Sequence, residues 1–330
     1  MRRILSIDGG GIKGTCPAAF LAAIEEKLPQ PIGSYFDLIA GTSTGGILAI
    51  GLGLGISAKD LHRLYVERGP EIFGESASRG KIASWLLRHF RYARSFVAAK
   101  HDETALKGIL EETLQDKRIG DAKTRLLIPA WDADLRSCYI YKTAHHERLT
   151  TDYKRLASDA AMATAAAPTY FRRHKTSDSV GLLDGGVWAN NPTGTAAIEA
   201  ITLLDWPKES LRILSLGCMD EVYMLSENPG KLSLGLRKAG FLNLFMDGQS
   251  SNSLGAAKLI TGHPHTGNRL FRFSPSAPAG FFKLDDPTKI ARLSGIGASM
   301  ARSAFPEIQQ TFFVGLAERF EPFYKVEEAA

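Results

Sequence analysis

The polar and apolar positions of this chain form short apolar runs separated by amphipathic or alanine-rich stretches, which is typical of an α/β protein. The apolar runs predict strands over residues 3–7, 36–40, 124–133, 136–143, 180–186 and 211–218. The stretches between and after them predict helices over residues 15–27, 47–55, 158–168, 191–204 and 286–303. Because the strands are apolar throughout and alternate with helices, we expect a mainly parallel sheet buried on both faces.

One uncharged stretch, residues 38–56, is nineteen residues long and approaches the length of a membrane span. It contains six glycines together with Thr42, Ser43 and Thr44. We interpret it as a buried strand, a sharp turn and a buried helix. The chain shows no internal repeat and no low-complexity linker, so we expect a single domain over residues 1–330.

Composition and charge restrict the classes of partner and the cellular compartment that we expect. Forty basic and 35 acidic residues give a net charge of +5, which does not indicate a nucleic-acid polymer as partner but suits an anionic lipid surface. The three cysteines, Cys16, Cys138 and Cys218, lack metal-binding or disulfide spacing and fit a reducing cytosol. Only four residues separate Arg3 from Asp8, so no signal-peptide core is expected there.

A glycine-rich loop, GGGIKG at residues 9–14, follows the first strand and precedes the first helix. Its spacing satisfies G-x-G-x-x-G, so a dinucleotide fold is one interpretation. That fold expects an acidic residue at the end of the second strand, where this chain has AGTSTGG. A phosphate-loop NTPase expects lysine and then serine or threonine after the last glycine, where this chain has Thr15 and Cys16. Both nucleotide interpretations therefore lack their second element.

The second turn, GTSTG at residues 41–45, matches G-x-S-x-G between a strand and a helix. This is the geometry of a nucleophile elbow, in which the glycines permit a tight turn that exposes the serine. Ser43 would lie at a helix N-terminus, where the dipole stabilises negative charge. The backbone N–H groups of Gly9, Gly10 and Gly11 would then form an oxyanion hole.

The nucleophile needs a general base, and two candidates follow from the sequence. A Ser–His–Asp triad would use His263 or His265, which lie in a segment typical of a loop. Asp184 ends an apolar strand and precedes two glycines. Partial burial there would raise its pKa and let it accept the proton directly.

The motifs DGGGIKG, GTSTGG, AAAPTYF, LLDGG and ILSLG occur in this order over residues 4–217. In this the chain resembles the patatin-like phospholipase family. The resemblance implies a three-layer α/β/α fold, a Ser43–Asp184 dyad without histidine, an oxyanion loop at Gly9 to Gly11, and no metal or other cofactor. It implies a motif-bearing core over about 1–217, completed by 218–330 within one hydrolase domain. Lys13 falls where the family has a basic residue and would meet a lipid phosphate.

The same resemblance extends to phospholipase effectors of cyclic-nucleotide antiphage systems. It implies a membrane phospholipid as substrate, a cyclic nucleotide as activator, and a cytoplasmic enzyme in peripheral contact with the inner face of the membrane. In GHPHTGNRLFRF we expect Arg269 and Arg272 to pair with the activator's phosphates and Phe271 or Phe273 to stack on a base. The competing interpretation is a strand whose basic residues face solvent.

A basic amphipathic segment, residues 81–100, contains five basic residues and no acidic one. Its pattern fits an interfacial membrane helix and also a surface helix packed on the core. Two other functions remain open at this stage: a nucleotide-binding protein that uses GGGIKG, and a catalytically silent regulatory module. Intact Ser43 and Asp184 argue against the silent module.

Overall fold

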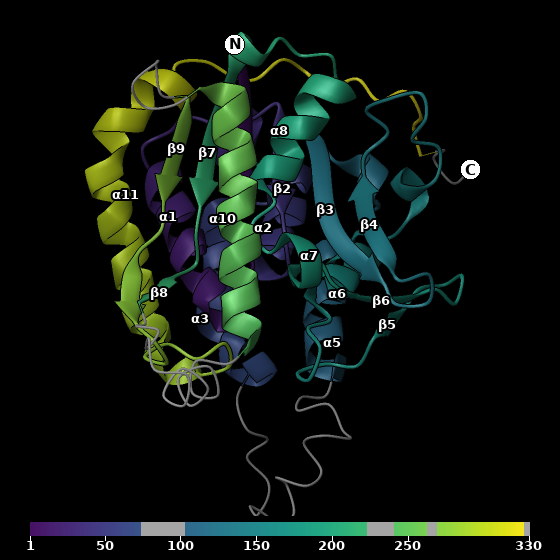
Figure 1. Ribbon diagram of the computed structural model, residues 1–330, viewed down its shortest axis with the longest axis vertical. Coiled ribbons are helices and arrows are strands. Elements are labelled where there is room, and N and C mark those ends of the chain that lie inside the picture. The colour runs from purple at the N-terminus through teal and green to yellow at the C-terminus, as the bar shows by residue number, and fades with distance from the viewer. Residues whose placement is uncertain (74–102, 223–240, 263–268, 327–330) are drawn as a thin grey trace, which may run out of the picture.

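The apolar runs pair into one eight-stranded sheet with strand order β5-β6-β3-β2-β1-β7-β9, and β4 pairs with β3 (Figure 1). The computed structural model describes residues 1–73, 103–222, 241–262 and 269–326. The strands are β1 (Arg2–Ile7), β2 (Leu38–Gly41), β3 (Arg125–Asp132), β4 (Ser137–Lys142), β5 (His174–Lys175), β6 (Gly181–Asp184), β7 (Leu211–Leu216) and β9 (Leu270–Phe273), with β8 (Asp220–Val222) and β10 (Ser276–Pro278) paired in a second, two-stranded sheet.

The strands from β3 through β2, β1 and β7 to β9 are parallel, whereas β4, β5 and β6 join antiparallel. In the centre, Ile7 of β1 is in register with Gly41 of β2 and with Leu216 of β7. The carboxyl ends of these three strands therefore meet at one edge of the sheet. Ligand sites of open parallel sheets lie at this edge.

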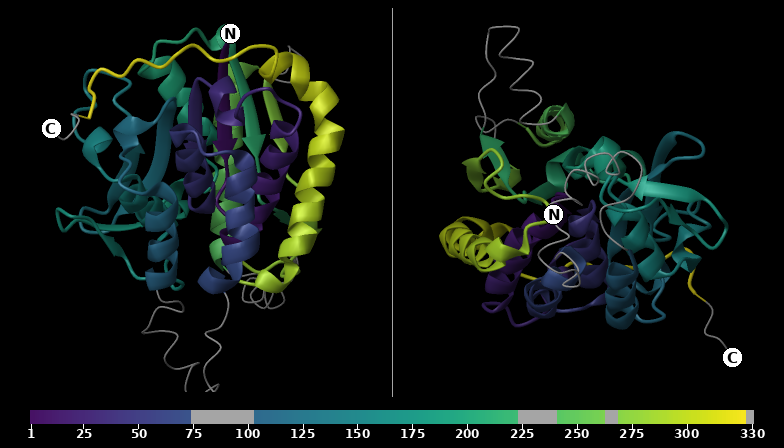
Figure 2. Two further views of the ribbon diagram at one scale, coloured as in Figure 1. Left: turned by 180° about the vertical axis from the view of Figure 1, so that it is seen from behind. Right: turned by 90° about the horizontal axis from the view of Figure 1, so that it is seen from below.

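Helices cover both faces of the sheet. They are α1 (Thr15–Glu25), α2 (Thr44–Leu54), α3 (Ala58–Phe73), α5 (Glu103–Leu114), α6 (Ala157–Ala165), α7 (Gly186–Ala189), α8 (Thr193–Thr202), α10 (Phe241–Thr261) and α11 (Ile290–Phe312). Helices α8 and α10 lie in front of the sheet in Figure 1, and the view from behind shows α11 in yellow beside α1 (Figure 2). The expected three-layer α/β/α fold is confirmed.

The alternation of side chains along the strands divides the core between the two faces. On β1, Leu5 packs with α1, α2 and α11 on one face, whereas Ile4 packs with Ala196 of α8 and Ala257 of α10 on the other. All four side chains are fully buried. Two separate apolar layers thus hold the sheet in place and fix the positions of the loops at its edge.

The uncharged stretch over residues 38–56 forms β2 and α2, as expected from its glycines. No helix within the described ranges combines the length and the apolar character needed to cross a membrane. The basic amphipathic segment, residues 81–100, lies outside the described residues.

The C-terminal third contributes to the same layers. Strand β9 pairs with β7, and α11 packs along α1. A short 3-10 turn over Pro287–Lys289 leads into α11, and Asp286 caps this turn, because its Oδ1 accepts from Thr288 N–H at 3.1 Å. These contacts support a single hydrolase domain over residues 1–330, which stays a prediction.

Candidate active site

Ser43 lies in the tight turn between β2 and α2, with φ 56° and ψ −127°. A positive φ is unfavourable for a residue with a side chain and marks local backbone strain. At Gly45 the turn brings the backbone so close to the end of β1 that a Cβ atom would lie 2.4 Å from the carbonyl oxygen of Ile7. This is the nucleophile elbow expected from GTSTG.

The strained turn is held by α6. Ser43 N–H donates to Thr164 Oγ1 at 3.0 Å, and the Thr164 hydroxyl donates to Pro129 O at 2.6 Å. Thr164 is fully buried. Its one sequence signal is that it is the only hydroxyl in the run AMATAAA at residues 161–167, and it was not predicted as a site residue. It fixes the backbone of Ser43 relative to β3.

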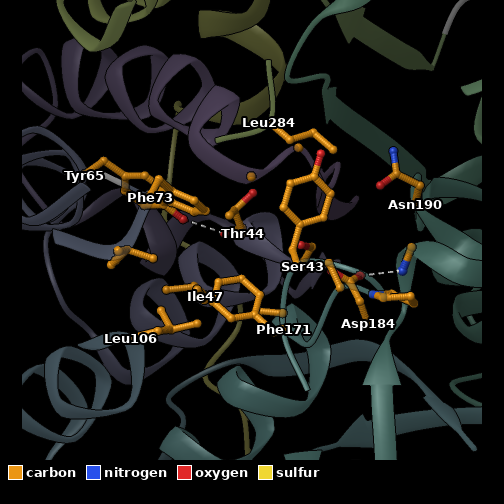
Figure 3. Close-up of a pocket in the computed structure, with 18 of the residues that line it drawn as sticks. Ser43, Thr44, Ile47, Tyr65, Phe73, Leu106, Phe171, Asp184, Asn190 and Leu284 are labelled. Atoms are coloured by element: carbon orange, nitrogen blue, oxygen red, sulfur yellow. Dashed lines mark hydrogen bonds between the residues drawn. The ribbon is translucent and has the colours of Figure 1, made fainter. Parts of the chain in front are cut away.

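Asp184 ends β6 beside Ser43, and its carboxylate interacts with the Ser43 hydroxyl, which contributes to its pKa. Both residues line the same pocket (Figure 3). Gly186 N–H donates to Asp184 Oδ1 at 2.6 Å, and Asp184 N–H donates to Ala166 O at 3.0 Å. The side chain is only 4% exposed. Burial raises the pKa of Asp184 to about 6, against the opposing effect of the hydrogen bonds from Ser43 and Gly186.

An apolar pocket opens next to this pair and encloses about 1070 Å³ of empty space, its mouth included. In Figure 3, Ser43 and Asp184 lie at one side of the pocket, and Ile47, Leu106 and Phe171 lie at the other. Helices α2, α3 and α5 supply much of the apolar lining, and the segment after α6 adds Tyr170 and Phe171. An extended hydrocarbon chain is the kind of ligand that such a lining accommodates.

The glycine loop borders the same pocket through Gly10 and Gly11. Gly11 has φ +56°, and a Cβ atom there would lie 2.3 Å from Leu284 O, so only glycine fits. No described residue accepts a hydrogen bond from the N–H groups of Gly10 and Gly11. Gly9 differs from the expectation, because its N–H donates to Asn190 O at 2.9 Å and is not free for an oxyanion.

The nucleotide interpretation of the loop gains no support. None of the described residues that line the pocket is a lysine, arginine or histidine, so no cation there could neutralise a phosphate. Lys13, expected to meet a lipid phosphate, does not line this pocket. Its ammonium group pairs with Glu221 at 3.2 Å, and the residue is only 8% exposed.

The two arginines expected to bind an activator lie on or next to β9. Arg272 donates to both oxygens of Asp8, at 2.9 and 2.6 Å, and to Ser215 Oγ at 2.9 Å. This partly buried ion pair occupies its guanidinium group, which corrects the expectation for Arg272. Phe271 and Phe273 are partly buried against the core, where their rings contact Phe312 and Phe20, and stacking of either on a base stays a prediction. Arg269 donates to Thr261 O, and its role toward an activator stays a prediction.

The histidines do not complete a triad within the described residues. His145 bonds Glu199 Oε1 at 2.9 Å, His174 bonds Asp159 Oδ1 at 3.1 Å, and His62 bonds Ser294 Oγ at 2.9 Å. Neither these three nor His146 lines the apolar pocket. His263 and His265 lie outside the described residues.

Comparison with known proteins identifies the family of this chain. The family model described as patatin-like phospholipase matches residues 5–197. A Pseudomonas aeruginosa protein named cGAMP-activated phospholipase is 39% identical over 218 residues, which cover 66% of this chain and 62% of that protein. Proteins of the same name from Vibrio cholerae and Escherichia coli are 32% and 30% identical, covering 92% and 97% of this chain and 91% and 94% of their own lengths. The chain belongs to the patatin-like phospholipase family of lipid-hydrolysing enzymes.

Proposed function

We propose that this chain is a serine acyl hydrolase of membrane phospholipids, with Ser43 as nucleophile and Asp184 as general base. The observation that carries the proposal is a buried carboxylate of raised pKa that lies beside the Ser43 hydroxyl at the side of an apolar pocket. A polar nucleophile next to a long apolar lining suits an ester whose acyl chain is a hydrocarbon. The turn holds Ser43 at the N-terminus of α2, which favours developing negative charge.

In the proposed reaction, Ser43 Oγ attacks the ester carbonyl carbon while Asp184 takes the hydroxyl proton. The carbonyl oxygen becomes an oxyanion and accepts hydrogen bonds from Gly10 N–H and Gly11 N–H. When the intermediate collapses, the alcohol of the lysophospholipid leaves with the proton held by Asp184. Water then attacks the acyl-serine with Asp184 again as base, which releases a fatty acid and restores Ser43.

The proposed base predicts a pH profile. Because the pKa of Asp184 is about 6 in the folded protein, kcat/KM should fall about tenfold for each pH unit below that value. An exposed aspartate would lose activity only near pH 4. The profile is measured with a soluble short-chain ester over pH 4.5–8.5. A constant kcat/KM down to pH 4.5 would exclude a base with this pKa.

The glycine loop is expected to act on the transition state. A Cβ atom at Gly10 would lie 2.5 Å from Cys218 Cβ, so in Gly10→Ala the loop must shift and move its N–H donor. Losing such a donor typically costs roughly 10²–10³ in kcat, and KM should change much less. Gly108→Ala is a matched control, because nothing lies within 4 Å of a Cβ atom there. An effect confined to KM would instead indicate a loop that only holds substrate.

The proposal also covers where in the cell the enzyme acts and which ligand activates it. The names of the relatives support activation by cGAMP, and the resemblance to antiphage effectors supports a role in antiphage defence. The enzyme would act from the cytoplasm in peripheral contact with the inner face of the membrane. An activator is physically reasonable there, because an uncontrolled phospholipase would attack its own membrane.

Vesicles of mixed phospholipids test the proposal. The purified protein, with cGAMP added, should release fatty acid and lysophospholipid that mass spectrometry detects, and it should be slow without cGAMP. Ser43→Ala under the same conditions should release neither product. Equal activity with and without cGAMP would exclude the activator, and absence of lipid products in both conditions would exclude the hydrolase.

A further inference from the structure

A second pocket, lined by basic and hydroxyl side chains, lies at the beginning of helix α6 and shares no lining residue with the catalytic pocket. It encloses about 950 Å³ of empty space, its open side included. The polar groups that could bind an anion there come from Arg118, Thr150, Thr151, Lys154, Arg155 and Ser177.

Two of the three cations in this pocket have no carboxylate to neutralise them. Arg155 pairs with Asp178 and donates to Ser177 Oγ at 3.2 Å. Arg118 donates to the backbone oxygen of Lys154, and the Lys154 ammonium lies 5.4 Å from the centre of the Tyr153 ring. Within the described part of the chain, neither Arg118 nor Lys154 forms an ion pair. A bound anion could pair with both of these side chains.

The N-terminus of α6 adds to this positive field. The first N–H of the helix, at Ala157, already donates to Lys117 O at 2.8 Å, but the helix dipole favours an anion at this end. Among the described lining residues Asp159 is the one carboxylate, and His174 Nε2 bonds it at 3.1 Å. Arg118 and Lys154 therefore supply two unpaired positive charges, which equal the two negative charges of a cyclic dinucleotide's phosphodiesters.

Helix α6 connects this pocket to the catalytic pair. Nine residues at 1.5 Å each place its two ends about 13 Å apart. At the far end, Thr164 accepts from Ser43 N–H and Ala166 O accepts from Asp184 N–H. A ligand that shifts or steadies α6 would thus act on the backbone of both catalytic residues.

We propose that this pocket, the α6 pocket, binds an anionic phosphodiester ligand that regulates the active site. That this ligand is cGAMP rests on the activation by cGAMP proposed above. Activation requires the ligand to bind the active arrangement of α6 more tightly than the resting one. Arg118 and Lys154 pair with the phosphodiesters, and the threonine and serine hydroxyls donate to their oxygens.

Charge-reversal variants test the α6 pocket. In Arg118→Glu and Lys154→Glu, the Kd for cGAMP measured by calorimetry should rise about tenfold or more. The cGAMP concentration for half-maximal activity should rise in parallel, with maximal activity unchanged. Asp159→Asn removes a repulsive charge and should lower the Kd. Arg302→Glu and Lys208→Glu, which reverse exposed charges elsewhere on the surface, should behave as wild type.

Inorganic phosphate and cGAMP-free phosphatidylglycerol vesicles serve as parallel probes of the same variants. If phosphate competes with cGAMP for the wild type but not for Arg118→Glu or Lys154→Glu, the α6 pocket is supported. Variants that lose only vesicle binding would identify a lipid-headgroup contact and overturn the regulatory site. If wild type and all variants bind cGAMP equally, the α6 pocket is wrong and the proposed activation stands. If the wild type binds no cGAMP, the α6 pocket as a cGAMP site and the proposed activation by cGAMP are both wrong.

Discussion

Ser43→Ala is expected to lower the rate of ester hydrolysis by about 10⁴-fold or more, as removal of the nucleophile does in other serine hydrolases. The reason is specific to this position: the turn at φ 56° presents the hydroxyl to a buried carboxylate and to the apolar pocket. No other described serine lines that pocket, so none can take over the reaction. The measurement is kcat/KM on a short-chain ester and on phospholipid vesicles.

The matched control for Ser43→Ala is Ser34→Ala. Ser34 lies in an exposed turn, where its hydroxyl donates to Pro31 O, and it is remote from the pocket. This variant should keep wild-type activity. If Ser43→Ala keeps a substantial fraction of the activity while Ser34→Ala is unchanged, Ser43 is not the nucleophile.

Asp184→Asn is expected to be almost as inactive as Ser43→Ala and, unlike it, more stable than the wild type. The amide cannot accept the serine proton as a carboxylate does, but its oxygen can still accept from Gly186 N–H. Burial raises the pKa of Asp184 to about 6 from an ordinary value of 3.8, so the fold disfavours the charged form. At neutral pH the neutral amide should therefore raise the free energy of unfolding by roughly 2–3 kcal/mol.

The same pKa fixes the sign of the pH dependence of stability. A raised pKa means that protonated Asp184 stabilises the fold below about pH 4, and that this contribution is lost as the pH rises to about 6. The stability difference between Asp184→Asn and wild type should therefore shrink on acidification from pH 7 to pH 4. Urea unfolding at these two pH values measures it. An inactive variant that is less stable at pH 7 would indicate a structural carboxylate rather than a catalytic base.

Local patterns in the sequence predicted the strands and the elbow because both depend on neighbouring residues. The run at residues 3–7 and the turn GTSTG are recognisable from apolar content and glycine spacing alone. The role of Arg272 could not be predicted in this way. Its partner Asp8 lies 264 positions earlier, and only the pairing of β9 with β7 brings them together.

The interactions that position Ser43 and the glycine loop were missed for a similar reason. The hydrogen bond between Ser43 and Thr164 joins residues 121 positions apart, and the one from Gly9 to Asn190 depends on α7 lying beside the loop. Sequence patterns predict which residues carry chemistry. The packing of distant elements decides which of their polar groups are already bonded and which remain free.

Covalent labelling tests the Ser43–Asp184 site most directly. A fluorophosphonate probe, which reacts with activated serine hydroxyls, is added to the folded wild-type protein, and the adduct is located by peptide mass spectrometry. The account predicts a single adduct on Ser43, with none in Ser43→Ala and a much slower reaction in Asp184→Asn. An adduct on a different serine, or equal labelling of Ser43 in Asp184→Asn, would contradict it.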